Sequence, residues 1–137
     1  MEKLIELYKK MSDNSILCFN HKFDVSDAAT IEIDNRYSIF ADFDSFETKH
    51  DEFAALVHEY GHCISGATHK LYSRYDIIDQ HENRENRAAV HEFLPCSKIL
   101  NAMKQGYTEV WQIAECLDVP DEFVTLAIEI YTAEQCL

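Results

Sequence analysis

The spacing of hydrophobic residues changes twice along the chain. Over residues 2–11 they recur every three or four positions, which predicts an amphipathic helix. Three short runs rich in β-branched and aromatic residues follow, and such runs are typical of strands. The predicted strands are 15–19, 30–33 and 36–43. Asp34 and Asn35 separate the last two runs and favour a hairpin. We therefore expect a small, mostly antiparallel three-stranded sheet.

After the predicted strands the hydrophobic pattern is helical. Thr48, with Asp51 three residues later, resembles a capping box and predicts a helix that runs to Ser65 and stops at Gly66. Cap, Gly and Pro residues divide the remainder into further helices. The expected ranges are Asp79 toward Pro95, 96–105, a helix starting at Thr108, and 121–133. A helix, a small sheet and then helices define an α+β fold, which we expect to form one domain over residues 1–137.

Composition indicates a soluble globular protein. Of the 137 residues, 47% are hydrophobic and 27% are charged, a balance that is ordinary for one such domain. No apolar run approaches the roughly 20 residues that cross a bilayer. The N-terminal sequence MEKLIELYKK also lacks the apolar core of a signal peptide. We therefore expect a cytoplasmic protein that does not associate with membranes.

The chain contains five scattered cysteines and no C-x-x-C pair. In a cytoplasmic protein this pattern is typical of buried, reduced thiols. Cys63 directly follows a histidine of the motif described below, but the two side chains point about 100° apart on a helix. We therefore expect Cys63 to contribute to packing.

The chain is strongly acidic, with 12 Lys and Arg against 25 Asp and Glu and a formal net charge of −13. Such a charge repels nucleic-acid phosphates and attracts basic partners. Within the C-terminal tail, residues 106–133, the stretch 108–130 resembles a helix-turn-helix. Its recognition helix, 121–133, begins with Asp121 and Glu122 and has no Lys or Arg. Phosphate and base recognition both need donors there. We therefore expect no direct nucleic-acid contact, and a packing or partner-docking role for the tail.

The sequence LVHEYGHCISG, at residues 56–66, contains two histidines four positions apart. Four residues of α-helix turn about 400°, so His58 and His62 lie about 40° apart and one turn above each other. Both imidazoles can then reach one ion. Zinc suits them because it accepts nitrogen ligands and is often held by three protein groups plus water. The competing interpretation is a surface helix with solvated histidines.

The same helix has two distinct faces. An apolar stripe is expected to pack on the sheet and consists of Phe53, Leu56, Val57, Tyr60 and Ile64. The two histidines lie about 140–180° around the helix from Phe53. Small residues beside them leave room for another helix or a ligand. These are Ala54, Ala55 and Gly61.

Glu59 lies about 100° around the helix from His58, at the edge of the predicted metal face. It is too far round to be an easy third ligand from the same helix. It is well placed to touch a water on the metal, which is the general-base position of the H-E-x-x-H pattern.

A third ligand must come from another segment. The candidates are Glu82, Glu85, His69, His81 and His91. Glu82 and Asn86 share one face of the next predicted helix with the small Ala89 and the apolar Phe93. If this face packs against the histidine helix, Glu82 can reach the metal and Asn86 can orient it. Glu85, about 60° away, is the second choice, and His91 points away.

Three stretches resemble the ImmA/IrrE-type metallopeptidases, small zincin-like proteins of phages and mobile elements. VHEYGHC (57–63) is similar to the family's helix with two histidines and a glutamate. HENRENRAAVHEFLP (81–95) is similar to its segment with a glutamate, an Asn or Asp four residues later, alanines and a closing proline. GYTEVWQIAECLDVPDEFVTLAI (106–128) is similar to the C-terminal tail of phage members. The likeness covers about residues 37–131.

The resemblance implies a zinc ion held by His58, His62 and Glu82, with Glu59 as the catalytic base. It implies a zincin-like domain that cleaves a helix-turn-helix, phage-type repressor and so lifts repression. Glu85 departs from the family pattern, which often has alanine there, and a large aromatic is common at the position of Ala88. The extra carboxylate keeps Glu85 open as a ligand.

Two further points stay open in the sequence. A donor that stabilises the oxyanion usually assists such a reaction, and three residues could supply it. They are His69, Tyr72 and His81. The alternative function is a non-catalytic, metal-containing anti-repressor that binds its partner without cutting it. The intact Glu59 favours the enzyme, because a closed structural metal site has no need of a base.

Overall fold

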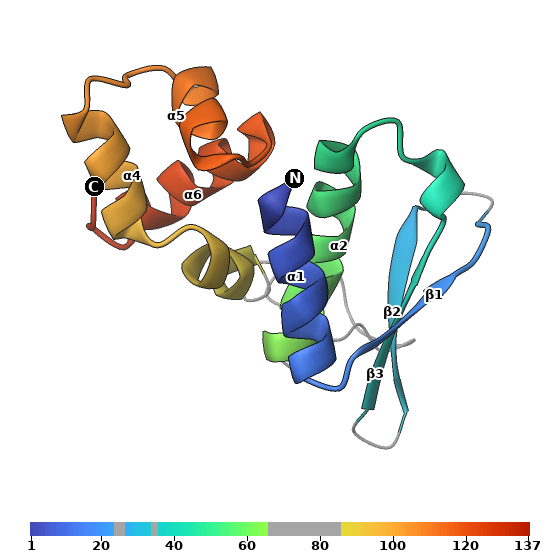
Figure 1. Cartoon of the computed structure of the whole chain (residues 1–137). Helices are drawn as coiled ribbons and strands as arrows, with labels where there is room; N and C mark the ends of the chain where they lie inside the picture. The colour runs from blue at the N-terminus through green and yellow to red at the C-terminus, as the bar shows by residue number, and fades with distance from the viewer. Residues whose placement is uncertain (24–26, 34–35, 66–85) are drawn as a thin grey trace.

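A computed structural model of the chain describes residues 1–23, 27–33, 36–65 and 86–137 (Figure 1). In chain order its elements are α1 (Glu2–Asp13), β1 (Leu17–Asn20), β2 (Ala28–Ile33), β3 (Arg36–Ala41), the 3-10 turn η1 (Phe43–Ser45), α2 (Lys49–Ser65), α4 (Cys96–Lys104), α5 (Val110–Leu117) and α6 (Asp121–Ala133). Residues 86–93 are also helical. The predicted α+β order is confirmed. No helix in these ranges combines the length and apolarity that crossing a membrane requires.

The sheet has the strand order β1-β3-β2 and is mixed. β2 and β3 form the predicted antiparallel hairpin, with Ile33 paired to Arg36, although Asp34 and Asn35 lie outside the described residues. The prediction of a mostly antiparallel sheet is wrong for β1, which pairs with β3 in parallel. The hairpin is encoded locally, whereas β1 pairs with the opposite edge of β3. Ser15, with φ 58°, lies in the turn between α1 and β1.

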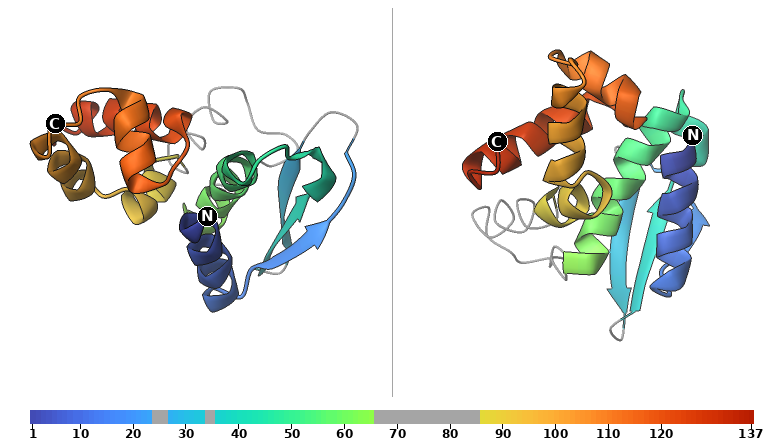
Figure 2. Two further views of the ribbon diagram at one scale, coloured as in Figure 1. Left: turned by 45° about the horizontal axis from the view of Figure 1, so that its top comes forward. Right: turned by 60° about the vertical axis from the view of Figure 1, so that its left-hand side comes forward.

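Helices α1 and α2 cover one face of the sheet, and α4, α5 and α6 gather on the far side of α2 (Figures 1 and 2). The strand residues that face this helical layer, Ile39 and Ala41, are fully buried. The C-terminal tail therefore packs with the rest of the chain, as expected. α2 lies between the sheet and the C-terminal helices.

α2 begins where the sequence predicted. The Thr48 hydroxyl accepts a hydrogen bond from the Asp51 backbone N–H at 3.0 Å, which satisfies one of the donors that a helix start leaves open. The predicted stop at Gly66 lies outside the described residues. The Phe53 ring meets Phe93 and Phe123 edge to face, with centroids 5.7 and 5.6 Å apart.

Four residues of the predicted apolar stripe of α2 are buried, and Ile64 is half-buried. Phe53 and Tyr60 of this stripe pack against Phe93 of residues 86–93. The Tyr60 hydroxyl also donates to Oε1 of Glu92 at 2.8 Å. The same oxygen accepts a hydrogen bond from Nζ of Lys10, on α1, at 3.0 Å. A single carboxylate therefore ties three helical segments together on this side of α2.

The helical residues 86–93 present the predicted faces. Ala89 and Phe93 are buried, while Arg87 and His91 are exposed. The predicted start of this helix at Asp79 lies outside the described residues. His91 contacts the Glu134 carboxylate at 2.9 Å, so this outer face meets the end of α6.

The C-terminal helices end and begin close to the predicted residues. α4 ends before Gly106, whose φ of +101° favours glycine. α5 starts later than the predicted Thr108, because Glu109 is its N-cap and forms a capping box with Gln112. α6 follows Pro120 as expected.

The cysteines are all free thiols, but the expectation that they are buried is wrong for several of them. Cys63 is buried, whereas Cys116 and Cys136 are exposed. Cys116 lies on α5 and Cys136 follows α6, where the chain faces solvent.

We expect Tyr131→Phe to lower the free energy of unfolding by about 1–3 kcal/mol. The Tyr131 hydroxyl donates to the Leu94 carbonyl at 2.8 Å in the buried core, and its loss leaves that carbonyl without this donor. Urea unfolding followed by circular dichroism measures the change. Tyr107→Phe is the control, because Tyr107 is exposed. Equal stability of the two variants would contradict this prediction.

Candidate metal centre

His58 and His62 lie one turn apart on α2, as the spacing predicted. Their ring centroids are 5.0 Å apart and the ring planes are nearly perpendicular, at 86°. His58 is half-buried, and His62 is only 5% exposed. The competing interpretation of two solvated histidines is therefore wrong for His62.

Glu59 completes a group of three side chains that converge on one point. One potential ligand atom from each of His58, Glu59 and His62 lies within 4.8 Å of the other two. Imidazole nitrogens are ligands that zinc accepts, and the adjacent Glu59 carboxylate lies where it can contact a zinc-bound water. The chemistry of these residues therefore fits a zinc ion held by the two histidines, with Glu59 beside it.

A residue of the sheet holds the Glu59 side chain in place. Its side chain is 8% exposed, and its Oε2 accepts a hydrogen bond from the Thr30 hydroxyl of β2. The Thr30 hydroxyl oxygen also lies 3.4 Å from the Glu59 backbone carbonyl oxygen. Because a buried carboxylate is costly without hydrogen bonds, this contact stabilises the charged side chain where the helix meets the sheet.

Cys63 is a packing residue, as predicted. It is buried, and burial together with the nearby Glu59 charge raises the pKa of its thiol to about 12. Cysteine binds metals as the thiolate. Cys63 is therefore a neutral neighbour of the candidate metal centre.

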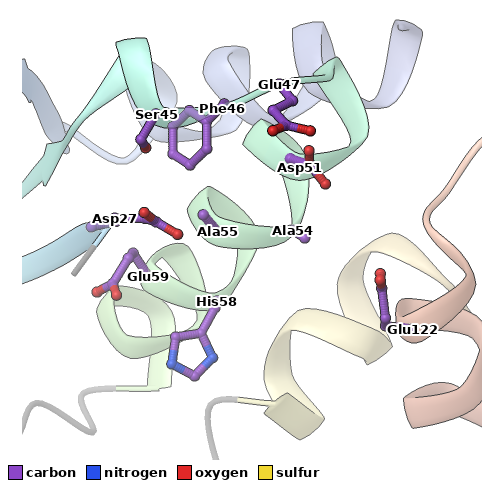
Figure 3. Close-up of a pocket in the computed structure, with 11 residues that line it drawn as sticks. Asp27, Ser45, Phe46, Glu47, Asp51, Ala54, Ala55, His58, Glu59 and Glu122 are labelled. Atoms are coloured by element: carbon purple, nitrogen blue, oxygen red, sulfur yellow. The ribbon is translucent and has the colours of Figure 1, made fainter. Parts of the chain in front are cut away.

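An open cleft of about 640 Å³ lies in front of this group (Figure 3). Its walls come from the sheet, the start of α2 and, across the cleft, Glu122 of α6. The lining residues are Asp27, Ala28, Ser45, Phe46, Glu47, Asp51, Ala54, Ala55, His58, Glu59 and Glu122. The small side chains of Ala54 and Ala55 leave space beside His58, as expected. Five of the lining residues are acidic and none is Lys or Arg, so the cleft favours cationic groups.

A smaller cavity of about 130 Å³ also borders His58. Asn86 and Ala89 of the helical residues 86–93 line it together with His58. The helix face that was predicted to carry the third ligand is thus turned toward the histidine helix. Most of the candidates for ligand or oxyanion donor lie outside the described residues. These are Glu82, Glu85, His69, Tyr72 and His81. His91 is exposed on the opposite face, as expected.

Sequence reasoning missed three residues of this site. Thr30 anchors Glu59, while Asp27 and Glu122 contribute charge to the cleft. A hydroxyl at an inward position of a strand was the one local indication for Thr30. Asp27 and Glu122 are far apart in sequence, and only the tertiary structure brings them to one cleft.

Comparisons with protein-family models, curated proteins and solved structures found no match to this chain. The resemblance to the ImmA/IrrE-type metallopeptidases therefore depends on the motif residues alone.

We expect His58→Ala and His62→Ala to lose tight zinc binding, because each removes a nitrogen ligand. Glu59→Gln should keep binding, since Glu59 is not needed as a ligand. Elemental analysis of the purified proteins and calorimetric titration measure this. The matched control is His50→Ala, two turns earlier on α2 and paired with Asp118 at 3.5 Å. Retention of one zinc equivalent by both alanine variants would contradict the metal centre.

We further expect Glu82→Gln to weaken zinc binding by more than the roughly 100-fold that losing an outer-shell partner costs. Glu85→Gln should change the affinity by less than about 10-fold. We expect this difference because Asn86, four residues after Glu82 in the sequence, lines the same cavity as His58. Competition titration with a chelator measures both affinities. The reverse order would make Glu85 the third ligand.

Proposed function

We propose that this protein is a zinc-dependent endopeptidase of the ImmA/IrrE type that hydrolyses a peptide bond in a helix-turn-helix, phage-type repressor. One observation carries the proposal. His58, Glu59 and His62 place their ligand atoms within 4.8 Å of one another, and His58 and Glu59 line an open cleft. Two imidazoles with an adjacent carboxylate beside a substrate-sized space are typical of a hydrolytic metal centre.

His58 and His62 would hold the zinc ion, with Glu82 as the third protein ligand and Glu85 as the alternative. When bound, zinc acts as a Lewis acid that polarises the scissile carbonyl and lowers the pKa of water toward about 7. Three protein ligands leave room for water or substrate, which distinguishes a catalytic centre from a closed structural one.

Glu59 is the general base in this proposal. Its carboxylate takes a proton from the attacking water and then delivers that proton to the leaving amine nitrogen. Oε2 is engaged by Thr30, and Oε1 accepts no hydrogen bond from the residues that the structure describes. The second oxygen is therefore the one that handles the proton.

The cleft suits a cationic polypeptide. Its carboxylates come from Asp27, Glu47, Asp51, Glu59 and Glu122. The whole chain carries a formal charge of −13, which speeds association with a basic partner and disfavours binding to DNA itself. DNA-binding proteins concentrate Lys and Arg, so a repressor segment is a fitting substrate. β2, an edge strand of the described sheet, borders the cleft at Ala28.

The alternative is a non-catalytic, metal-containing anti-repressor. Glu59 argues against it, because a carboxylate held beside the two histidines and lining the cleft is placed for proton transfer. In either case we propose that the protein acts in the cytoplasm, where its repressor partner works.

We expect the wild-type protein with zinc to cut its cognate repressor, and Glu59→Gln to reduce the rate by at least roughly 100-fold while still binding zinc. Co-incubation followed by intact-mass spectrometry detects the fragments. Glu129→Gln is a matched control, because Glu129 is exposed on α6 and lies outside the cleft lining. A stable complex without fragments would instead identify a binding protein.

A further inference from the structure

Thr30 is a strand residue that contacts the proposed general base. β2 lies at the edge of the described sheet, and the side chain of Thr30 faces α2. The register supports this orientation, because Thr30 pairs with the fully buried Ile39 and directly paired residues share one face of a sheet. The next residue, Ile31, points to the other face and is exposed.

The Thr30 hydroxyl has one proton to donate, and two oxygens of Glu59 lie near it. Oε2 of the side chain is the closer acceptor, while the backbone carbonyl oxygen is 3.4 Å away. The carboxylate therefore receives the proton. Hydrogen bonds to charged groups are about twice as strong as neutral ones, so this contact fixes the rotamer of Glu59 more firmly than packing alone.

The geometry gives the two carboxylate oxygens different roles. Oε2 is turned to the sheet, where Thr30 holds it. Glu59 nevertheless lines the open cleft with His58. A glutamate has three rotatable side-chain bonds, and a general base must be held within hydrogen-bond reach of the proton that it takes. An anchor on one oxygen supplies that restraint and leaves the other oxygen available.

We propose that Thr30 is a positioning residue of the peptidase, and that its hydroxyl holds the Glu59 carboxylate at the angle required for proton transfer. The inference rests on the proposed function. It extends the site from α2 to the sheet and assigns β2 a role in catalysis besides its structural one.

Thr30→Val tests this role, because valine keeps the shape of threonine and replaces only the hydroxyl by a methyl group. We expect kcat on the repressor to fall by roughly 10- to 100-fold, which corresponds to losing a hydrogen bond to a charged group. KM should change by less than about twofold, since the substrate does not depend on this bond. Zinc affinity should change by less than about threefold, well below the cost of losing an outer-shell partner of a metal ligand.

Thr30→Ser is the rescue variant, because serine restores the hydroxyl, and it should recover kcat to within about fivefold of wild type. Ile31→Val is the control for a general effect on the strand, since it alters the opposite, exposed face of β2. Crystal structures of the zinc-loaded wild type and Thr30→Val give a second readout, the position of the Glu59 carboxylate. In Thr30→Val we expect this carboxylate to leave its wild-type rotamer.

The inference requires both results together. A fall in kcat with an unmoved carboxylate, or a displaced carboxylate with an unchanged kcat, would each overturn it. A loss of activity in Ile31→Val as large as in Thr30→Val would overturn it too. Cleavage by Glu59→Gln at the wild-type rate would instead contradict the proposed function, and the crystal structures would still report whether Thr30 anchors Glu59.

Discussion

The burial of α2 on two sides is the constraint on which the rest of the structure depends. On one side Phe53 packs between Phe93 and Phe123, and complete burial of such a side chain contributes about 1.5–3 kcal/mol. On the other side Thr30 of the sheet binds Glu59. Contacts on both sides fix the rotation of the helix about its axis. The strip between them, which carries His58, is left to face the cleft.

The polar contacts on α2 serve different purposes on its two sides. The Glu92 carboxylate accepts from Tyr60 and Lys10, and it joins α1, α2 and residues 86–93. These bonds orient helices, because a buried or half-buried carboxylate is stable only where its donors are in place. The bond from Thr30 to Glu59 instead orients one side chain that also borders the cleft.

The C-terminal tail shows how a familiar pattern can take another role. Its acidic last helix lacks the cations that DNA recognition needs, and Phe123 of that helix packs on Phe53. Glu122, one residue earlier, lines the cleft across from α2. The tail therefore closes the core and adds charge to the cleft wall. Both roles follow from the start of α6 lying against α2.

The sequence by itself determined the local features. It predicted the α+β order, the Thr48 cap, the hairpin of β2 and β3, the pairing of His58 with His62 and the inward face of residues 86–93. Each depends on a repeat of 3.6 or 2 residues or on the chemistry of a cap, and all of these are properties of neighbouring residues. The placement of Glu59 at the edge of the histidine face followed from the same helical geometry.

Only the tertiary structure decided which surface each face meets. A helical wheel gives angles around α2 but not the identity of its neighbours. The stripe with Phe53 and Tyr60 was therefore predicted to pack on the sheet, and only the structure shows that both of these rings contact Phe93. Three further features likewise depend on distant segments meeting. They are the parallel pairing of β1 with β3, the hydrogen bond from Thr30 to Glu59, and the position of Asp27 and Glu122 in one cleft. Such contacts are selected by the packing of the whole core, because many pairings satisfy the local pattern but few of them form one close-packed core.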